Sequence, residues 1–452
     1  MSSRPTEKPQ PSLSRRTFFK RTLVGATVIG LPTGLAACGG DSSGDSSKSP
    51  VKFAVLSDTH FFDTAALGDS AELDAYLLQD RKMIKESVEI FDAALADIKS
   101  QNLDFLLISG DLTKDGERSG HEALAKRLAA LGKKVYVIPG NHDINNPHAR
   151  DYRTTPSTAA TQVTPDDFRS IYANCGYGSA LYSDPNSLSY IAEPAEGVWL
   201  FAIDSCQYAN NLSLGEPVTA GAISDLSLGW IEARLQEAKS RGKIVIGMMH
   251  HGLVEHFTGQ SSLFSEYLVN KREAIAAMLA ANGLGVMFTG HFHANDVVGK
   301  TYSGKTIYDV ETGSTVTAPS PYRFVSLDRS TATLTISTSV VTKTGSHPSD
   351  FQTWAKDYLT SGLNTLVTYM LTNAPYNLPS AQVTALLPLI VPALVAHYAG
   401  DEKLTDATTQ ATLAAMVAST DANTKMMGGL IQGLWADPSP ADNNLSLTLA
   451  KA

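Results

Sequence analysis

The stretch VKFAVLSDTH, residues 51–60, places a run of apolar and β-branched residues directly before a small polar cluster. The apolar part, residues 51–56, is short enough to be a strand that is buried on both faces. The same arrangement recurs four times, because residues 105–108, 135–138, 244–246 and 286–288 are also short apolar runs that precede polar residues. The chain therefore repeats one unit, a buried strand that ends in polar side chains.

The five polar clusters contain residue types that bind divalent metals. Helical patterns separate some of the strands, the clearest having apolar residues at steps of three and four from Ile84 to Ile98. Alternating strands and helices favour a partly parallel sheet, whose ligands bind beyond the carboxyl ends of the strands. We therefore expect all five clusters to meet on one rim. They are Asp58-Thr59-His60, Gly110-Asp111, Gly140-Asn141-His142-Asp143, His250-His251 and Gly290-His291-Phe292-His293.

The clusters suit a site for two metal ions. Two divalent ions about 3.5–4 Å apart need a shared anionic ligand, and nitrogen or oxygen donors complete the coordination. Asp111, which stands alone after its glycine, suits the shared position, and Asn141 offers a neutral carbonyl oxygen. Glycines directly before the ligands permit sharp turns where a Cβ would crowd the backbone. Two pairs of residues two apart could each turn toward one ion: Asp58 with His60, and His291 with His293.

The series DxH, GD, GNHD and an H followed by GHxH, in that order, resembles the calcineurin-like metallophosphoesterase superfamily from Val51 to about Gly345. The resemblance implies an α/β fold, a layered αββα sandwich. It also implies that His142 contacts the phosphoryl group or protonates the leaving oxygen. The implied ligands are Asp58, His60, Asp111 and His293 for one metal, and Asp111, Asn141, His250 and His291 for the other.

Within the superfamily, residues 140–149 and 186–190, with the His250-His251 pair, are similar to a bacterial branch associated with cyclic-nucleotide phosphodiesterase activity.

Other branches differ after the GD motif. Protein Ser/Thr phosphatases continue with an Asp and then Arg-Gly, and purple acid phosphatases have an iron-binding Tyr at the position of Lys114. Both classes are therefore disfavoured. The change also removes the acidic partner of the GNH histidine, for which Asp115 and Asp143 are the candidates.

The resemblance implies a dinuclear-metal-dependent phosphoesterase that hydrolyses phosphodiester bonds, cyclic nucleotides among them, by attack of a metal-bridging hydroxide. The two divalent ions could be Mn, Fe or Zn, because His, carboxylate and amide ligands accept all three. A small phosphate ester is the expected substrate, since the chain has a net charge of −9 and no dense basic stripe for a long nucleic acid. Two alternatives are an exported phosphomonoesterase or nucleotidase that scavenges phosphate, and a non-catalytic surface lipoprotein scaffold.

The first 50 residues resemble an export address. Arg15-Arg16 and the apolar residues 23–37 are typical of a twin-arginine signal, and Leu35-Ala36-Ala37-Cys38 resembles a lipobox. We expect a signal region at 1–38, lipidation and membrane anchoring at Cys38, and a flexible tether at 39–50. The implied location is extracytoplasmic. An ordinary cleaved signal, with Cys38 incidental, is the alternative.

A C-terminal all-α domain at 350–445 is expected after the phosphoesterase domain at 51–345, whose last strands are predicted at 322–327 and 333–337. Helices are predicted near residues 351–371, 380–398 and 405–434. The apolar run 386–395 contains two prolines and falls short of a membrane span. We expect a bundle that packs on the catalytic domain or forms a homodimer, with a membrane-surface role as the alternative.

The cysteines allow one disulfide. After Cys38 the chain contains only Cys175 and Cys206, and neither lies in a metal cluster. In an oxidising compartment they could pair if their Cα atoms approach within about 7 Å. A catalytic thiol is not expected.

Overall fold

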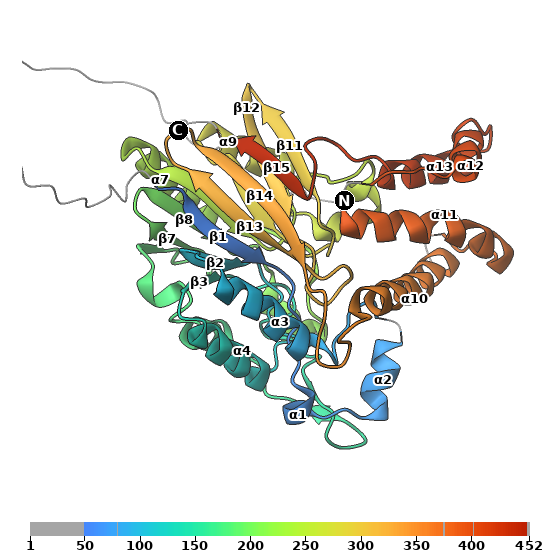
Figure 1. The fold of residues 1–452 in the computed structure, drawn as a ribbon, viewed down its shortest axis with the longest axis horizontal. Coiled ribbons are helices and arrows are strands. Elements are labelled where there is room, and N and C mark those ends of the chain that lie inside the picture. The colour runs from blue at the N-terminus through green and yellow to red at the C-terminus, as the bar shows by residue number, and fades with distance from the viewer. Residues whose placement is uncertain (1–48, 79, 374–375, 401, 450–452) are drawn as a thin grey trace, which may run out of the picture. The chain divides into compact units, whose positions relative to one another are not determined.

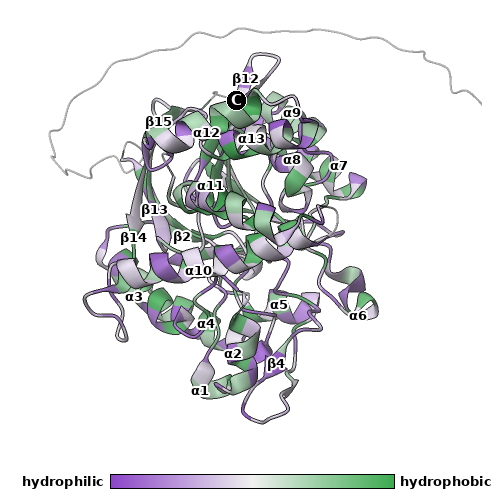
Figure 2. Cartoon of the chain, turned by 90° about the vertical axis from the view of Figure 1, so that its right-hand side faces the viewer, coloured by the Kyte–Doolittle hydropathy of each residue, from purple (hydrophilic) through white to green (hydrophobic). Residues whose placement is uncertain are grey.

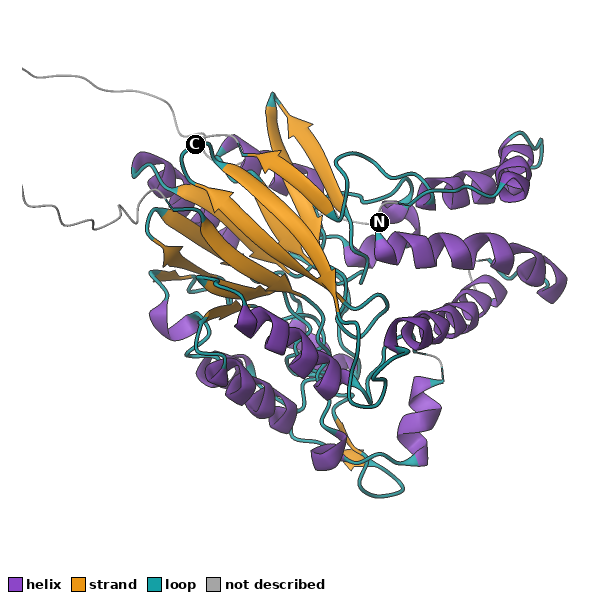
Figure 3. Ribbon diagram, in the orientation of Figure 1, coloured by secondary structure: helices purple, strands orange, loops and turns teal. Residues whose placement is uncertain are grey.

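The computed structural model describes residues 49–449 except 79, 374–375 and 401. The predicted signal region and all but the last two residues of the predicted tether lie outside the described residues. Two large β-sheets with helices on their outer faces form the described region before the C-terminal helices (Figures 1 and 3).

The first sheet has six strands in the order β15-β14-β13-β1-β2-β3. Strands β1, β2 and β3 are parallel, as expected for strands whose polar clusters meet at one end, whereas β13, β14 and β15 add antiparallel neighbours. The strands are β1 (Val51–Leu56), β2 (Phe105–Ile108), β3 (Lys134–Val137), β13 (Pro321–Asp328), β14 (Thr333–Val340) and β15 (Asn444–Thr448).

The second sheet has seven strands in the order β11-β12-β10-β9-β8-β7-β6. Its centre, from β8 to β12, is parallel, and antiparallel strands lie on both sides. The strands are β6 (Tyr182–Ser183), β7 (Tyr190–Ala195), β8 (Val198–Ile203), β9 (Ile244–Met249), β10 (Val286–Thr289), β11 (Val297–Tyr302) and β12 (Lys305–Glu311). A small separate sheet pairs β4 (Arg150–Asp151) with β5 (Thr158–Ala159).

Apolar cores on both faces of each sheet hold the layers together. Phe53, Phe105 and Phe288 belong to the core between the sheets, and the first two rings stack at 4.6 Å between centroids. Helices α3 (Ser87–Ser100) and α4 (Arg118–Ala130) pack outside the first sheet. Helices α7 (Asp225–Ser240) and α9 (Arg272–Ala281) pack outside the second. The order helix, sheet, sheet, helix confirms the predicted αββα class.

Short helices lie in the loops between these layers. Helices α1 and α2 follow β1, and α5 follows β5. Helix α6 comes after β8 and the 3₁₀ turn η2, and α8 with the 3₁₀ turn η3 follows β9. Their bounds are α1 (Thr64–Leu67), α2 (Ala71–Leu77), α5 (Pro165–Ile171), η1 (Tyr177–Ser179), η2 (Tyr208–Asn210), α6 (Asn211–Leu214), α8 (Gln260–Leu263) and η3 (Ser265–Tyr267).

Four helices follow β14, and Figure 2 looks onto them. They are α10 (Phe351–Thr372), α11 (Ser380–Ala399), α12 (Ala407–Val417) and α13 (Ala422–Leu434). Helix α10 packs on α11, and α13 packs on both α11 and α12. The third predicted helix, 405–434, is therefore two helices, because the chain leaves helical geometry between Val417 and Asp421, which caps α13 through its side chain.

Two features of this C-terminal region differ from the sequence analysis. Helix α11 has the predicted range and one further residue, but whereas the apolar run 386–395 alone falls short of a membrane span, the whole 20-residue helix could by length and composition alone cross a membrane, although a third of its apolar window is buried in the protein. After α13 the chain forms β15, which pairs with β14. The predicted region 350–445 thus ends in the first residues of a strand of the first sheet.

The cysteines are separate in the structure. Cys175 is buried and Cys206 is partly buried, and both are free thiols. Cys175 belongs to the core outside the first sheet, whereas the Cys206 thiol donates to the Pro139 carbonyl oxygen at 3.3 Å. No disulfide therefore joins these two described residues.

Candidate metal centre

The five polar clusters meet where strands of both sheets end. Three clusters follow β1, β2 and β3 of the first sheet, and two follow β9 and β10 of the second. Main-chain bonds join neighbouring clusters: the Asp58 N–H donates to the Gly110 carbonyl at 3.1 Å, and the Gly290 N–H donates to the His250 carbonyl at 3.0 Å. The predicted rim is therefore built from two sheets that face each other.

The loops that carry these clusters have an unusual backbone. Five predicted ligands have positive φ angles, from 37° at His60 to 77° at His291. Residues other than glycine rarely adopt this region, and each such conformation costs about 1–3 kcal/mol. Packing on both sides must enforce it, and strain of this kind is common at functional sites. The five residues are Asp58, His60, Asp111, His291 and His293.

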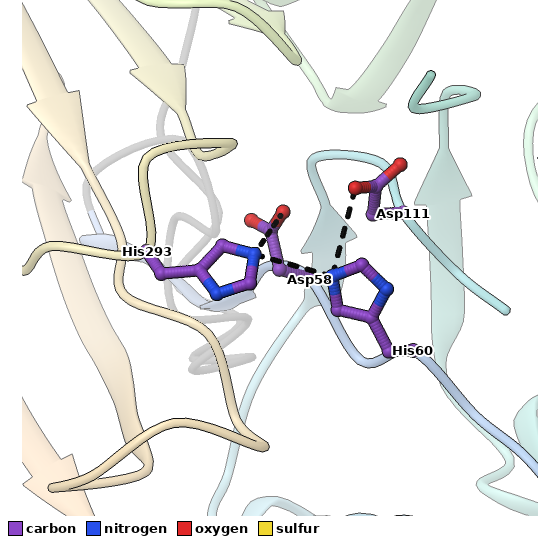
Figure 4. A group of neighbouring side chains, drawn as sticks. All are labelled: Asp58, His60, Asp111 and His293. Carbon is purple, nitrogen blue, oxygen red and sulfur yellow. Dashed lines mark hydrogen bonds and ion pairs between the residues drawn. The ribbon is translucent and has the colours of Figure 1, made fainter. Parts of the chain in front are cut away.

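One group of side chains, shown in Figure 4, contains Asp58, His60, Asp111 and His293. The Nε2 atoms of His60 and His293 are 3.2 Å apart. His60 Nε2 lies 3.6 Å from an Asp111 carboxylate oxygen, and His293 Nε2 lies 3.4 Å from Asp58 Oδ1. All four side chains are at most 4% exposed. Four donors therefore converge on one buried point.

A second group contains Asp111, His250 and His291. His250 Nε2 lies 3.5 Å from Asp111 Oδ1 and 3.2 Å from the Asn141 side-chain oxygen. Asp111 is common to the two groups, and its two carboxylate oxygens face different groups. The structure thus brings together all seven residues that the sequence analysis assigned to metals, in two sets that share Asp111.

The chemistry of this donor set fits divalent cations. Burial holds the pKa values of His60 and His291 well below their usual range, so both imidazoles are neutral. Burial raises the pKa of Asp111, but the nearby His250 and His142 have the larger, opposite effect. The pKa therefore lies well below its usual value, and the carboxylate stays ionised. The buried Asp58 Oδ1 has no hydrogen-bond partner among the described residues. Neutral imidazoles and carboxylates with available lone pairs are the ligands of borderline divalent metals.

Hydrogen bonds from the other ring nitrogens orient three of the histidines. With the proton assigned to the atom that faces an oxygen, His250 Nδ1 donates to the Ser109 carbonyl at 2.8 Å, and His293 Nδ1 donates to Thr317 Oγ1 at 3.1 Å. His291 Nε2 donates to the Glu266 carbonyl at 3.3 Å. These bonds direct the opposite nitrogen of each ring toward the centre, as in protein metal sites.

Two glycines allow the ligand loops to approach one another. A Cβ on Gly140 would collide with the backbone and carboxylate of Asp111, and a Cβ on Gly290 would collide with the side chains of Ser57 and Asp58. Neither glycine has a positive φ angle. We expected these glycines to permit sharp turns of the backbone. At these two positions they are instead required because the neighbouring loop packs too closely for a Cβ.

His142 lies beside the two groups and is the more accessible residue. Its side chain is 21% exposed, and its Nε2 lies 4.0 Å from Asp111 Oδ2. Its Nδ1 contacts Asp115 Oδ1 at 3.0 Å. Burial lowers the pKa of His142, but the Asp111 and Asp115 carboxylates outweigh it and raise the pKa above its usual value. Of the two candidate acidic partners, Asp115 is the one that contacts the imidazole.

Asp143 has a different task. Its carboxylate accepts hydrogen bonds from the Leu112 N–H at 3.0 Å and the Gly140 N–H at 2.8 Å, so it ties the GD loop to the GNHD loop. Asp115 is in turn paired with the buried Lys114 ammonium group, which lies 4.2 Å from the centre of the Tyr76 ring. A buried ion pair therefore supports the partner of His142.

His251 belongs to neither ligand group. Its Nδ1 contacts Ser205 Oγ and its Nε2 contacts the Thr219 carbonyl, both at 2.8 Å. Its ring packs 4.5 Å from that of His291, and Tyr267 packs 4.6 Å from His291 on another side. These neighbours fix a predicted ligand in place, and the sequence contains no motif that identifies Tyr267 or Thr317 as part of the site.

Comparison with known proteins identifies the family. Residues 51–295 match the model of the calcineurin-like phosphoesterase family, and this segment is more than half of the chain. The chain belongs to the calcineurin-like phosphoesterase family. Membership in this family implies a metal-dependent phosphoester hydrolase with a dinuclear divalent metal centre, to which the two ligand groups correspond.

Curated relatives of this calcineurin-like phosphoesterase include two bacterial proteins. A probable cyclic nucleotide phosphodiesterase of Pseudoalteromonas sp. (strain SM9913) is 33% identical over 95 residues, 20% of this chain and 36% of the relative. The 3′,5′-cyclic adenosine monophosphate phosphodiesterase of Vibrio vulnificus (strain CMCP6) is 28% identical over 102 residues, 23% of this chain and 33% of the relative. The chain spans about a third of the length of both relatives.

Solved structures similar to this calcineurin-like phosphoesterase include a dimetal phosphatase from Danio rerio, with 15% identity and a TM-score of 0.46 over 64% of this chain and 96% of the other. A purple acid phosphatase from yellow lupin (Lupinus luteus) has 11% identity and a TM-score of 0.39 over 67% of this chain and 52% of the other.

Proposed function

We propose that the chain is a phosphodiesterase that hydrolyses small phosphodiesters, cyclic nucleotides among them, at a dinuclear metal centre. The observation that carries the proposal is the pair of buried ligand groups that share Asp111, with the accessible His142 beside them. The names of the two bacterial relatives support a diester as substrate. The proposed ligands are Asp58, His60, Asp111, Asn141, His250, His291 and His293.

The chain's own residues would bind the substrate and move a proton. Contacts with carboxylates raise the pKa of His142, which suits it to donate a proton from Nε2 to the leaving oxygen, while Asp115 fixes the ring through Nδ1. The side-chain amide of Asn141 could donate to a phosphoryl oxygen in addition to its contact with His250. Two divalent cations, when bound, would supply Lewis-acid stabilisation and lower the pKa of the attacking water.

The test compares hydrolysis of bis(p-nitrophenyl) phosphate and p-nitrophenyl phosphate by protein reconstituted separately with Mn²⁺, Fe²⁺ and Zn²⁺. We expect preference for the diester, and we expect Asp111→Ala and His250→Ala to lose most of the activity. His148→Ala, which changes an exposed histidine of the following loop, should retain it. Monoester preference would favour a phosphate-scavenging phosphatase. Absence of turnover with every metal would favour a scaffold protein, and near-normal turnover in Asp111→Ala would refute the assigned site.

We also propose that the protein is exported and anchored through a lipid on Cys38, which would direct its activity to extracytoplasmic phosphodiesters. The Arg15-Arg16 pair and the Leu35-Ala36-Ala37-Cys38 segment support this location. A Cys38→Ser variant should leave the membrane fraction and appear in the soluble extracytoplasmic fraction. Membrane association that survives this substitution would argue against the anchor and direct attention to α11.

A further inference from the structure

A second group of acidic side chains lies outside the metal centre. Glu402 follows α11, and Asp437 and Asp442 lie between α13 and β15. Each of the three offers a carboxylate oxygen within 4.8 Å of the others. Glu402 and Asp442 are buried, and solvent reaches Asp437. Carboxylates at this separation repel one another, and burial strengthens the repulsion because it removes solvent screening.

Glu402 provides a second and independent observation. Its side chain is 1% exposed, and Oε1 accepts a hydrogen bond from His397 Nδ1 at 2.5 Å. Its other oxygen, Oε2, is buried and has no hydrogen-bond partner among the described residues. A buried carboxylate oxygen without a donor loses its hydration with no compensation, which is unfavourable unless a cation contacts it.

The nearest basic side chains for which contacts are described are His397, His256 and Arg323. His397 Nδ1, which contacts Glu402, also lies 3.4 Å from Asp296 Oδ2. His256 is surrounded by carboxylates of its own, with Asp296 at 2.8 Å and Glu311 at 3.5 Å. Arg323 donates to the main-chain carbonyl oxygens of Glu311 and Asp442. None of these contacts reaches Glu402 Oε2.

We propose that Glu402, Asp437 and Asp442 bind a calcium ion at a site separate from the dinuclear centre. The three side chains supply only oxygen atoms, which hard cations prefer, whereas the dinuclear centre is rich in imidazole. Solvent at Asp437 leaves room for the water ligands that complete a calcium coordination sphere. Mg²⁺ fits less well because it requires near-ideal octahedral geometry, whereas Ca²⁺ accepts irregular arrangements of carboxylates.

The bound ion would connect the C-terminal region to a loop of the metal centre. Asp442 Oδ1 accepts a hydrogen bond from the Val297 N–H at 2.8 Å, and Asn443 Oδ1 accepts one from the Asn295 side chain at 2.9 Å. Asn295 and Val297 follow His293 by two and four residues. The calcium ion would therefore fix the end of α11, the segment before β15 and the loop that carries His293 in one arrangement.

The test uses Tb³⁺, which replaces Ca²⁺ and emits when a nearby tryptophan transfers energy to it. Trp435 is two residues from Asp437. We expect a saturable Tb³⁺ signal that Ca²⁺ displaces, and a loss of Ca²⁺ affinity of more than about tenfold in Glu402→Gln, because carboxylate number sets affinity at such sites. Asp357→Asn removes an exposed carboxylate on α10 and should change nothing. Asp58→Asn, in the dinuclear centre, should keep the signal, which separates the two sites.

A stability measurement covers the case in which Glu402→Gln fails to fold. Ca²⁺ should raise the melting temperature of the unchanged protein and of Asp357→Asn by several degrees, but not that of Asp437→Asn. Because Asp437 is exposed to solvent, its substitution should not prevent folding. The proposal is overturned if Ca²⁺ leaves the melting temperature unchanged, or if Asp437→Asn binds Tb³⁺ and Ca²⁺ as well as the unchanged protein does.

Discussion

His142 differs from its neighbours in exposure. Its side chain is 21% exposed, whereas those of His60 and His293 are at most 4% exposed. A buried imidazole next to carboxylates is suited to metal coordination, while one that reaches solvent can meet a substrate. Asp115 holds the Nδ1 side of the His142 ring, so Nε2 is the atom available to the substrate.

The proton-donor role of His142 predicts a dependence on the leaving group. In His142→Ala, turnover of a diester with an alkoxide leaving group should fall by about 10²–10⁴-fold, because the alkoxide needs a proton. Turnover of bis(p-nitrophenyl) phosphate should fall much less, since nitrophenolate leaves without one. Steady-state kinetics on both substrates with equally metal-loaded protein make the comparison. Equal losses would mean that His142 contacts the phosphoryl group instead.

At the residue scale, the sequence predicted which side chains would gather but not all of their partners. The order and spacing of the five clusters were sufficient to propose Asp111 as the shared residue. Asp115 and Asp143 are both close to His142 in the sequence, and only the fold decides that Asp115 contacts it. Thr317, which orients His293, is a neutral residue in a loop and leaves no sequence pattern.

The loops at the strand ends are the elements that make the site. Short apolar runs predicted β1, β2, β9 and β10, because a strand buried on both faces needs apolar residues throughout. The strand β15 was missed because its sequence, Asn-Leu-Ser-Leu-Thr, is short and half polar, and its pairing with β14 decides its structure. Helix α11 agrees with its predicted range, 380–398, to within one residue, and it contains two internal prolines.

Close contact between two of these loops predicts the effect of Gly290→Ala. The added Cβ would collide with Ser57 and Asp58, so the loop that carries His291 and His293 must move away from β1. We expect Gly290→Ala to lose at least one bound metal ion per chain and a corresponding part of its activity, while it keeps its fold. Metal analysis by mass spectrometry and circular dichroism measure the two effects.

Gly229→Ala is the matched control for this substitution. Gly229 lies in α7, where a Cβ meets nothing within 4 Å. Alanine is the better helix former by about 1 kcal/mol, so stability should rise slightly and metal content should not change. If Gly290→Ala retains full metal content, the close approach of the two loops is not required for the site.

For the whole molecule, the two sheets contribute ligands to one centre, so any change in how they pack should reach the metals. Strands β1, β2 and β3 provide Asp58, His60, Asp111 and Asn141, and strands β9 and β10 precede the remaining histidines. The core between the sheets contains residues from both ends of the described chain, from Val51 to Leu449. The sequence indicated a layered fold but gave no sign that residues near 447 belong to this core.

The core position of Leu447 gives a prediction on stability. Leu447 is 2% exposed and lies between the sheets, so Leu447→Ala should lower the free energy of unfolding by about 2–4 kcal/mol. Ser446→Ala, on the exposed side of the same strand, should change it by less than about 0.5 kcal/mol. Denaturant unfolding of both variants makes the measurement. Equal, small effects would mean that β15 does not form in solution.

The pairing of β15 with β14 has a consequence for how this architecture can vary. The two strands are antiparallel neighbours, with Ser337 opposite Asn444, so helices α10–α13 occupy the place of the turn of a β-hairpin. Loop tips are the positions at which proteins accept whole inserted domains, because the flanking strands keep their register. The helices are therefore an insertion into the two-sheet fold rather than an appendix to it, and exchanging them for a short turn would test whether the two sheets fold without them.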